Sequence, residues 1–249
     1  MKKDIINSTE IKFIDLGLPS GLLWANCNVG ALAPEEYGLY FAWGETEGYE
    51  GITDKKRFRW TDYKLCGGIR TTLTKYNNNS YYGTVDNLVT LELIDDAAYQ
   101  SNNTCRMPTK ADFEELVTNT TSVWETLNGV NGRRFTSKTN GNSIFIPAAG
   151  YCFYDSVDSV KILVQLWSSS CSGEPIYSNF FEASSDNINF TYGHERCMGL
   201  PVRAVKEANS VFDPNNYYTK SEVDAKILEL QTLINNYING TSQVSELDA

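Results

Sequence analysis

The chain has 249 residues and a mass of 27.9 kDa, and its 41% apolar and 12% aromatic content is typical of a globular protein rather than a disordered one. Its 31 acidic residues outnumber its 21 basic residues and give a net charge of −10. That balance argues against nucleic acid as a partner, because nucleic-acid-binding proteins carry a basic surface. The single histidine excludes a His-rich metal site and a two-histidine active site, so we expect neither a metal nor another cofactor.

The first residues and the apolar runs of the chain predict neither export nor membrane insertion. Lys2 and Lys3 are not followed by the apolar segment of a signal peptide, and no run is long and apolar enough to span a bilayer. We therefore expect folding in a cytoplasm and no membrane partner. The cysteines show no C-x-x-C spacing and are expected to be small buried thiols, although their even number leaves disulfide pairing open. They are Cys27, Cys66, Cys105, Cys152, Cys171 and Cys197.

Short apolar runs separated by turns fill the first third of the chain. They predict strands over Ile11–Leu16, Leu22–Ala25 and Tyr40–Trp43. Residues 50–85 are rich in Thr, Tyr, Asn and Gly and have no hydrophobic period. This composition predicts a long insertion dominated by loops and turns.

Two helices are expected in the middle of the chain. Asp95–Tyr99 is expected to form a short one. A stronger helix begins at Thr109, because Thr109 and Asp112 have the spacing of a capping box and Phe113 and Leu116 lie on one apolar face.

The second half of the chain predicts further short strands. Asn140-Gly141 separates two strand-like runs, Arg134–Ser137 and Ser143–Pro147, and is a typical hairpin turn. Later strands are expected over Val164–Ser168, Ser178–Ala183, Ile188–Tyr192 and Leu200–Val205. Many short strands with two helices and long loops indicate the α+β class.

The last forty residues differ in character from the rest. We predict a first domain over residues 1–207, a polar linker over 208–216, a helix over 217–240 and a loose acidic tail over 241–249. Thr219 and Glu222 have capping-box spacing at the start of the helix. An apolar seam of a/d heptad spacing follows, and it consists of Val223, Ile227, Leu230, Ile234 and Tyr237.

This seam predicts that the chain associates with itself. A helix of about 20 residues is marginal alone in water, so the seam must be buried against a partner. The 4-3-4-3 spacing favours a coiled coil of two or three chains, and the mixture of residue types leaves dimer and trimer open. Docking of the helix on its own domain is the alternative.

Motifs for catalysis are missing from the sequence. There is no G-x-S-x-G, no phosphate loop and no calcium loop of the D-x-[DN]-x-[DN]-G type. The carboxylate pairs Glu35/Glu36, Asp95/Asp96 and Glu114/Glu115 are interpreted as solvated helix starts or faces. His194 is expected to be an exposed loop residue beside Glu195 and Arg196. We therefore expect a protein that is not an enzyme and has no catalytic residues.

Residues 151–197 carry the composition of a binding surface. Tyr, Phe, Trp, Ser and Asn alternate there, and such residues combine rigid contact area with adaptable hydrogen bonding. Because strand side chains alternate between faces, about half of the aromatic residues are expected in the core and the others on a ligand face. The candidate ligand-binding residues are Trp167, Tyr177, Asn179, Asn187, Asn189, Tyr192, His194 and Arg196.

Several blocks of the first domain resemble a domain that is repeated across Bacteroides-type bacteria and their phages. The blocks occur in the same order and are Phe13–Ala25, Asn28–Ala31, Pro34–Thr46, Cys105–Thr109, Phe145–Tyr151, Leu166–Ser170 and Gly199–Val205. That domain is similar to the C-type-lectin-like fold of formylglycine-generating enzymes and of the variable proteins of diversity-generating retroelements.

The resemblance implies the fold but neither catalysis nor calcium binding. The shared landmarks are the Arg-Met-Pro-Thr helix start at Arg106 and the terminal strand with Val202 and Arg203. The enzyme branch depends on a cysteine pair near that strand, where this sequence has only Cys197. The Glu-Pro-Asn and Trp-Asn-Asp sugar motifs of animal C-type lectins are absent, and Glu174-Pro175-Ile176 matches the first only in part.

The segment Asn216–Asp224 resembles one that leads into a short coiled coil in phage fibre and receptor-binding proteins. Together the two resemblances imply a structural protein of a phage virion, a head fibre, tail fibre or capsid decoration. It would be assembled in the host cytoplasm and attach the virion to a host surface glycan or protein. The alternatives are a spacer that binds other virion proteins, a bacterial surface adhesin, and an enzyme that cleaves glycans or oxidises at Cys197.

Overall fold

The computed structural model describes residues 11–53, 56–190, 193–208, 227–228, 230–232 and 234–235. Contacts divide the chain into two units, Met1–Asn209 and Ser210–Ala249, and this boundary falls inside the predicted linker. The described residues of the second unit are helical. Several predicted features lie outside the described residues: the ligand candidate Tyr192, the linker residues 209–216, the helix start with Thr219 and Glu222, the seam residues Val223 and Tyr237, and the acidic tail 241–249.

The first and last described strands of the first unit lie in one sheet, where both pair with the same central strand. A sheet of order β1-β2-β14 is formed by β1 (Phe13–Asp15), β2 (Leu22–Asn28) and β14 (Arg203–Glu207), and Trp24 lies opposite Val205. The neighbouring β3 (Tyr40–Phe41) pairs with β13 (Leu200–Pro201). The two ends of the domain are therefore joined by backbone hydrogen bonds.

A second sheet is an antiparallel meander of β4 (Thr120–Leu127), β5 (Val130–Ser137) and β6 (Ser143–Pro147). The predicted pairing of β5 with β6 is confirmed. The strand β4 was not predicted; it pairs with β5 through a two-residue turn, Asn128-Gly129. Both turn residues have positive φ, of 48° and 84°, as a type I′ hairpin requires.

Three of the strands predicted toward the end of the domain lie in a third sheet, whereas the strand predicted over Leu200–Val205 is divided between β13 and β14 in two other sheets. β10 (Tyr177–Ala183) pairs with β9 (Val164–Cys171) along its length, and shorter β11 (Ile188–Asn189) and β12 (His194–Glu195) pair with its other edge. The register of β9 and β10 shifts between Ser178 and Phe180. A separate hairpin is formed by β7 (Tyr151–Phe153) and β8 (Ser156–Asp158).

The described part of the first unit has two α-helices, α1 (Ala97–Ser101) and α2 (Lys110–Asn119), close to the predicted ranges. The expected capping box of α2 is present: Thr109 accepts from the backbone N–H of Asp112, and the Asp112 side chain accepts from the N–H of Thr109. Phe113 and Leu116 on its apolar face are buried in the core. The Phe113 ring stacks on Phe181 of β10 with centroids 4.9 Å apart, which fixes the helix on the third sheet.

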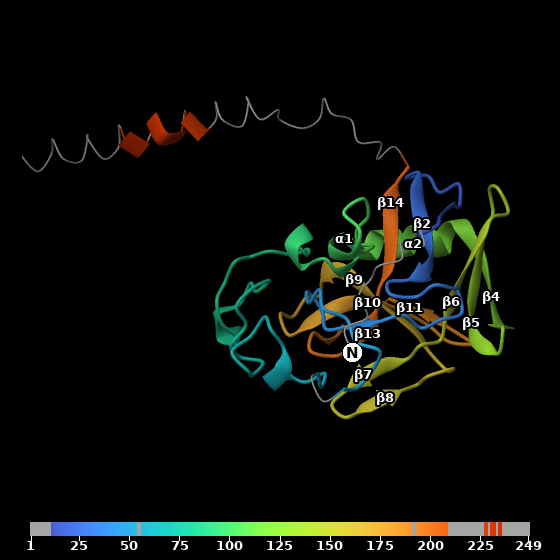
Figure 1. Ribbon diagram of the computed structural model, residues 1–249, viewed down its shortest axis with the longest axis horizontal. Coiled ribbons are helices and arrows are strands. Elements are labelled where there is room, and N and C mark those ends of the chain that lie inside the picture. The colour runs from blue at the N-terminus through green and yellow to red at the C-terminus, as the bar shows by residue number, and fades with distance from the viewer. Residues whose placement is uncertain are drawn as a thin grey trace, which may run out of the picture. The chain divides into compact units, whose positions relative to one another are not determined.

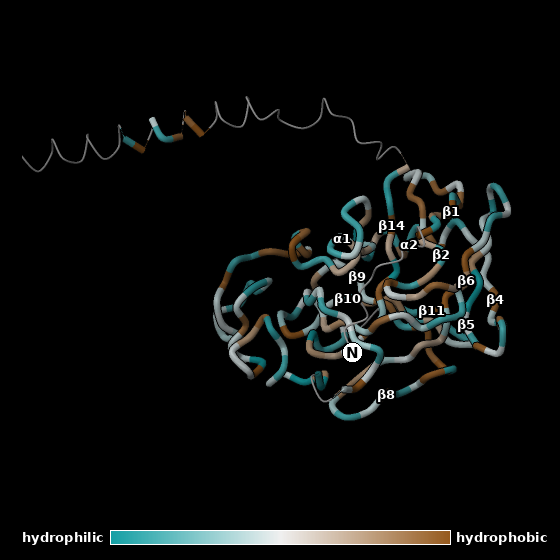
Figure 2. The backbone as a smooth tube through the Cα atoms, viewed as in Figure 1, coloured by the Kyte–Doolittle hydropathy of each residue, from teal (hydrophilic) through white to brown (hydrophobic). Residues whose placement is uncertain are grey.

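Residues 44–96, here called the loop-rich segment, contain three short 3₁₀ helices, η1 (Trp60–Asp62), η2 (Ser80–Tyr82) and η3 (Leu93–Asp95). The insertion predicted over residues 50–85 is thus loop-dominated, as expected. Figure 1 shows the segment, in cyan to green, on the side of the domain opposite β4, β5 and β6. Its last part, coloured largely brown in Figure 2 before α1, exposes the apolar side chains of Val89, Leu93 and Ile94.

The architecture is mixed, with several small sheets and few helices, and it belongs to the α+β class that the sequence predicted. Buried apolar residues of the first unit form three clusters, centred on Phe113 and Phe181, on Trp43 and Trp167, and on Phe58 and its neighbours. All six cysteines are free thiols; four are buried, and Cys66 and Cys171 are half-buried. In the part of the chain that the structure describes, no helix has the length and apolar character needed to cross a membrane.

Candidate functional site

Two of the predicted ligand-binding residues belong to the core. Trp167 has no exposed surface, and its indole N–H donates to the carbonyl oxygen of Phe41 at 2.7 Å. Arg196 is 1% exposed, donates from Nε to Ser178 Oγ at 3.1 Å, and has its guanidinium 4.6 Å from the Trp43 ring centroid. Neither side chain reaches the surface, so the expectation that they contribute to an exposed ligand face was wrong.

His194 is half-buried rather than an exposed loop residue. Its ring lies 4.0 Å from the centroid of Phe180 and 5.6 Å from that of Tyr151. Burial lowers the pKa of His194 to about 4, even though the charge of Glu182 acts in the opposite direction. At pH 7 the imidazole is therefore neutral, and its Nε2 accepts from the Gln165 side-chain amide at 3.1 Å. The neutral ring is therefore packed between aromatic side chains and accepts a hydrogen bond.

The remaining candidates do not converge on one place. Tyr177 and Asn179 on β10 are half-buried, and the Asn179 amide donates to the carbonyl oxygen of Cys171 at 2.6 Å. Asn187 and Asn189 are exposed beside and on β11. The structure therefore separates an exposed asparagine pair from the interior residues, and residues 151–197 do not form a continuous aromatic ligand face.

The thiols of the domain are all held in the protonated form. Burial raises the pKa of each of the six cysteines, and for Cys105 and Cys152 the value reaches about 12. A thiol with a raised pKa is a poor nucleophile, because the thiolate is the reactive form. Among the residues that the structure describes, no three His, Cys, Asp or Glu side chains lie close enough together to hold a metal ion.

A cleft of about 340 Å³ opens in the loop-rich segment, where the sequence predicted no site. We call it the loop cleft. Trp60 and Tyr154 supply aromatic surface, and Arg59 and Arg70 supply positive charge. The lining that the described residues contribute contains no carboxylate. The described residues that line it are Arg59, Trp60, Thr61, Gly68, Ile69, Arg70 and Tyr154.

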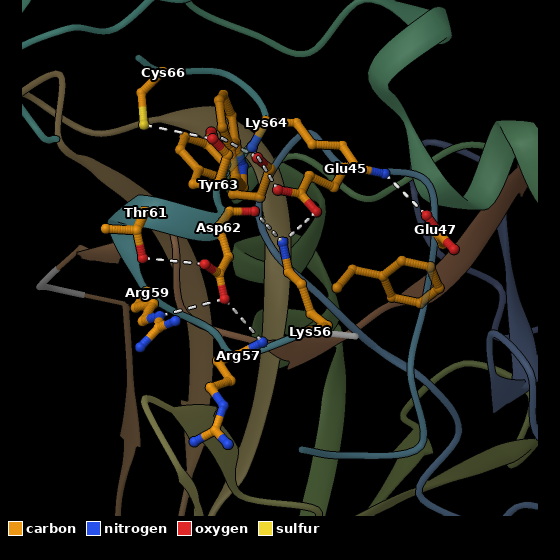
Figure 3. Close-up of polar contacts among 12 residues, drawn as sticks. Glu45, Glu47, Lys56, Arg57, Arg59, Thr61, Asp62, Tyr63, Lys64 and Cys66 are labelled. Carbon is orange, nitrogen blue, oxygen red and sulfur yellow. Dashed lines mark hydrogen bonds and ion pairs between the residues drawn. The ribbon is translucent and has the colours of Figure 1, made fainter. Parts of the chain in front are cut away.

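One wall of the loop cleft is fixed by a buried ion pair. Lys56 Nζ lies 2.6 Å from Glu45 Oε2, with both side chains almost fully buried, and also donates to the carbonyl oxygen of Asp62 at 2.9 Å. The second oxygen of Glu45 accepts from the backbone N–H of Lys64 at 2.8 Å. Figure 3 shows these contacts joining the two ends of the 56–64 loop. The pair therefore holds η1, and with it Trp60, in place.

Asp62 organises the same loop from its outer side. Its carboxylate accepts from the Thr61 hydroxyl at 3.1 Å, and from Arg59 Nε and the backbone N–H of Arg57 at 3.3 Å each (Figure 3). Burial alone would raise the pKa of Asp62, but the Thr61 hydrogen bond and the Arg59 charge outweigh burial and lower it. The ionised carboxylate thus orients Arg59 through Nε.

The opposite wall of the cleft is the tip of a short hairpin over residues 66–73. Cys66 and Leu73 form a β-bridge, and Gly67 N–H donates to the carbonyl oxygen of Thr72 at 2.9 Å. The Cys66 thiol connects the two walls: it donates to the carbonyl oxygen of Trp60 at 3.3 Å, and the N–H of Gly68 donates to its sulfur at 3.3 Å. A thiol serves here as a structural hydrogen-bonding group.

Tyr154 completes the cleft from a distant part of the sequence. It is the first residue of the two-residue turn between β7 and β8, and its φ of 51° is rare for a bulky residue. The turn is held in place because Tyr154 N–H donates to the carbonyl oxygen of Phe58 at 3.1 Å and Asp155 pairs with Arg57. The side chain of Tyr154 remains 51% exposed.

The sequence contained a signal for this cleft that its composition masked. Arg57-Phe58-Arg59-Trp60 alternates two guanidinium and two aromatic groups, and Phe58 is fully buried whereas its neighbours are not. The contributions of Arg70 and Tyr154 depend on tertiary contacts and have no counterpart in local spacing. Comparisons with known proteins add no family to this description: no family model matches the chain, and no curated protein or solved structure matches it significantly.

Proposed function

We propose that the protein is a non-enzymatic structural component of a phage virion, a head fibre, tail fibre or capsid decoration, that displays its first domain for attachment to a host surface glycan or protein. Residues 1–207 would have a C-type-lectin-like fold. Residues 217–240 would join two or three chains into the stalk or anchor of the displayed domain. The partners are other copies of this chain, other virion proteins and the host surface.

The observation that carries this proposal is the apolar seam of the tail. Ile227, Leu230 and Ile234 lie in helical backbone and are 48%, 58% and 55% exposed in the single chain. Their i, i+3, i+7 spacing places them on one helix face. Burying each such side chain stabilises a folded or associated state by about 1.5–3 kcal/mol. Association of several chains through this helix face would bury the seam residues of every copy.

Two features of the first domain support the lectin-like part of the proposal. The landmark segments that carry the resemblance are paired in space, since Arg106 and Val205 exchange both backbone hydrogen bonds at 2.9 Å. Arg203 in the second landmark is fully buried and donates to Asn28 Oδ1 and to the carbonyl oxygens of Ala25 and Phe145. These landmark residues therefore stabilise the interior of the domain, whereas its exposed surface is formed largely by loops.

The chemistry of the described side chains supports a binding role over a catalytic one. The neutral, packed imidazole of His194 and the six protonated thiols leave these groups without the acid–base or nucleophilic character that hydrolysis or oxidation at a cysteine needs. The open, two-arginine loop cleft offers a concave surface to a ligand.

Three measurements test the proposal. Light scattering should show an oligomeric full-length chain and a folded monomer when the chain is truncated after Asn215; a monomeric full-length chain, or an oligomeric truncation, would refute the role of the seam. Antibody labelling of purified phage particles that carry this gene should place the protein in the virion. Addition of purified full-length protein should then reduce phage adsorption to host cells. Labelled particles with unchanged adsorption would favour the spacer over the attachment protein.

A further inference from the structure

We propose that the loop cleft binds a small acidic saccharide, a sugar unit carrying one carboxylate, and that Arg70 and Arg59 recognise the carboxylate while Trp60 and Tyr154 contact the face of the ring. This inference rests on the proposed attachment function and names the chemistry of the receptor. It moves the ligand site from residues 151–197, where the sequence predicted it, to the loop-rich segment.

The charges of the cleft select an anion. Arg70 is exposed at the hairpin tip and forms no ion pair within the described part of the chain. Arg59 directs Nε to Asp62, and its side chain is 42% exposed. Guanidinium groups bind carboxylates through two parallel hydrogen bonds, and such charge-assisted bonds are stronger than neutral ones. A ligand that carries one carboxylate can accept hydrogen bonds from both arginines of the cleft.

The overall charge of the protein limits the size of that anion. The chain carries a net charge of −10, which repels a polyanion lying along its surface, within the Debye length of about 8 Å at physiological salt. The nearby acids Asp62, Asp155 and Glu195 are engaged with Arg59, Arg57 and the Trp60 indole, but they still contribute negative potential. A ligand with a single charge on a largely uncharged body fits this field, and a nucleic acid does not.

The aromatic surfaces of the cleft are held rigid, as a binding platform requires. The Trp60 indole N–H donates to Glu195 Oε2 at 3.2 Å, and its ring packs edge-on against Tyr63 at 5.6 Å. Tyr154 is kept at positive φ, a conformation that is unfavourable for a residue other than glycine, by its contact with Phe58. A conformation of this kind that the surroundings maintain is common at ligand-binding positions. Here it keeps a half-exposed phenol ring at the cleft.

The size of the cleft agrees with a ligand of one or two sugar rings. Its volume of about 340 Å³ lies at the lower end of the range of roughly 300–1,000 Å³ for small-molecule sites. Gly68, with φ of 93° and no atom within 4 Å of its would-be Cβ, leaves one wall open, so a longer glycan chain is able to leave the site. The cleft would therefore bind a single sugar unit of a surface polysaccharide.

The test compares methyl glucuronoside with methyl glucoside, which differ only in a carboxylate that replaces a hydroxymethyl group. Binding to the full-length protein is followed by NMR through the indole N–H signal of Trp60, assigned by its loss in Trp60→Phe. We expect the glucuronoside to shift this signal and the glucoside to bind at least fivefold more weakly, since the glucoside lacks the carboxylate that forms charge-assisted hydrogen bonds. The Trp124 indole signal serves as an internal reference outside the cleft.

Variants separate the carboxylate contact from the fold. Arg70→Gln should weaken glucuronoside binding about fivefold or more and leave glucoside binding unchanged. Lys12→Ala, which removes one exposed charge elsewhere in the domain, should change neither. Unchanged amide spectra outside residues 59–72 show that Arg70→Gln is folded. Should that spectrum change globally, Arg59→Lys, which keeps the charge and loses the guanidinium fork, provides the same comparison.

Each outcome decides a specific part of the proposal. Equal binding of both glycosides, or binding unaffected by Arg70→Gln and Arg59→Lys, would overturn the carboxylate contact. Tighter binding of thymidine monophosphate than of the glucuronoside would overturn the saccharide. Virion labelling and adsorption inhibition without glucuronoside binding would leave the attachment function standing and remove this site. Glucuronoside binding by a protein absent from virions would do the reverse.

Discussion

The strand-built part of the first domain and the loop-rich segment are stabilised by different interactions. In the strand-built part, fully buried aromatic rings such as Phe113, Phe135 and Phe181 pack on one another. In the loop-rich segment, Phe58 and its apolar neighbours are also buried, but single polar side chains satisfy many backbone groups. Glu45 accepts from the N–H of Lys64, and Asp86 accepts from the N–H groups of Tyr76, Asn77 and Leu88. Apolar packing makes the strand-built part a rigid scaffold. Directed hydrogen bonds hold the irregular loop-rich segment in one conformation around the loop cleft.

The largest effect is expected from a substitution in the strand-built core. Phe181 has no exposed surface and contacts the rings of Phe113, Phe135 and Phe190 at 4.9–5.8 Å. Phe181→Ala should lower the free energy of unfolding by about 3–5 kcal/mol, because it removes transfer free energy and leaves a cavity. Urea unfolding measures this loss. The surface control Ile162→Ala, at a position 62% exposed, should stay within about 0.5 kcal/mol of the unmodified protein.

A Phe181→Ala loss below about 1 kcal/mol would show that the core relaxes around the site. Loop amides that lose their protection to the same extent as those of α2 would show that the two regions unfold together. Either result would break the comparison between them.

The sequence predicts an element of this fold when the pattern that specifies the element lies within a short stretch of the chain. The helix α2 follows from Thr109 and Asp112, and the β5–β6 hairpin from alternation and a turn, so both were predicted. The strand β4 was missed although Asn128-Gly129 is a strong hairpin signal, because Thr120–Leu127 lies half in solvent and shows no clean alternation.

The site was predicted less well because it depends on contacts distant in sequence. Alternation along β10 was used to divide residues between core and ligand face, but the register shift between Ser178 and Phe180 interrupts that alternation. Trp167 and Arg196 were misplaced for a related reason: their hydrogen-bond partners come from β3 and β10 and cannot be read from their own neighbours. The loop cleft joins Trp60 and Tyr154 through the Phe58 bridge, which no local pattern encodes.

An intermediate effect is expected when pH changes, and it should begin in the strand-built part. The pKa of His194 is about 4 in the folded protein, because burial disfavours the charged ring, and about 6.5 when the chain is unfolded. Between these values the unfolded state binds more protons, so the free energy of unfolding falls as pH falls from about 6.5 to 4, by up to about 3 kcal/mol. Above pH 7 His194 contributes no pH dependence.

Urea unfolding at pH 7 and pH 5 measures this effect, and His194→Phe removes the titration while keeping ring contacts with Phe180 and Tyr151. We expect the unmodified protein to lose about 2 kcal/mol more than the variant between these pH values. Equal losses in both proteins would show that protonated His194 is tolerated at its position. The stability of the strand-built part would then show no dependence on pH above the pH range in which carboxylates titrate.

The smallest effect is expected in the loop-rich segment, at Asp86. Its carboxylate accepts from the backbone N–H of Tyr76 at 2.7 Å, of Asn77 at 2.9 Å and of Leu88 at 3.1 Å. Burial acts to raise the pKa of Asp86, but these backbone donors outweigh it and lower the pKa. The contribution of the ionised carboxylate is therefore present above the unfolded pKa of about 3.9 and is lost as pH falls through the lower folded pKa, below the range in which His194 titrates.

Asp86→Asn keeps the shape of the side chain but exchanges one acceptor oxygen for an amide donor that faces the N–H of Tyr76. We expect a local loss of about 1–2 kcal/mol, which corresponds to roughly 5- to 30-fold faster hydrogen exchange at Tyr76, Asn77 and Leu88 with unchanged exchange in α2 and β9. The control Asp186→Asn, in an exposed turn, should leave all these rates unchanged. If exchange accelerates equally in α2, the loop-rich segment is part of the cooperative core, and its polar contacts stabilise the whole domain rather than the walls of the loop cleft alone.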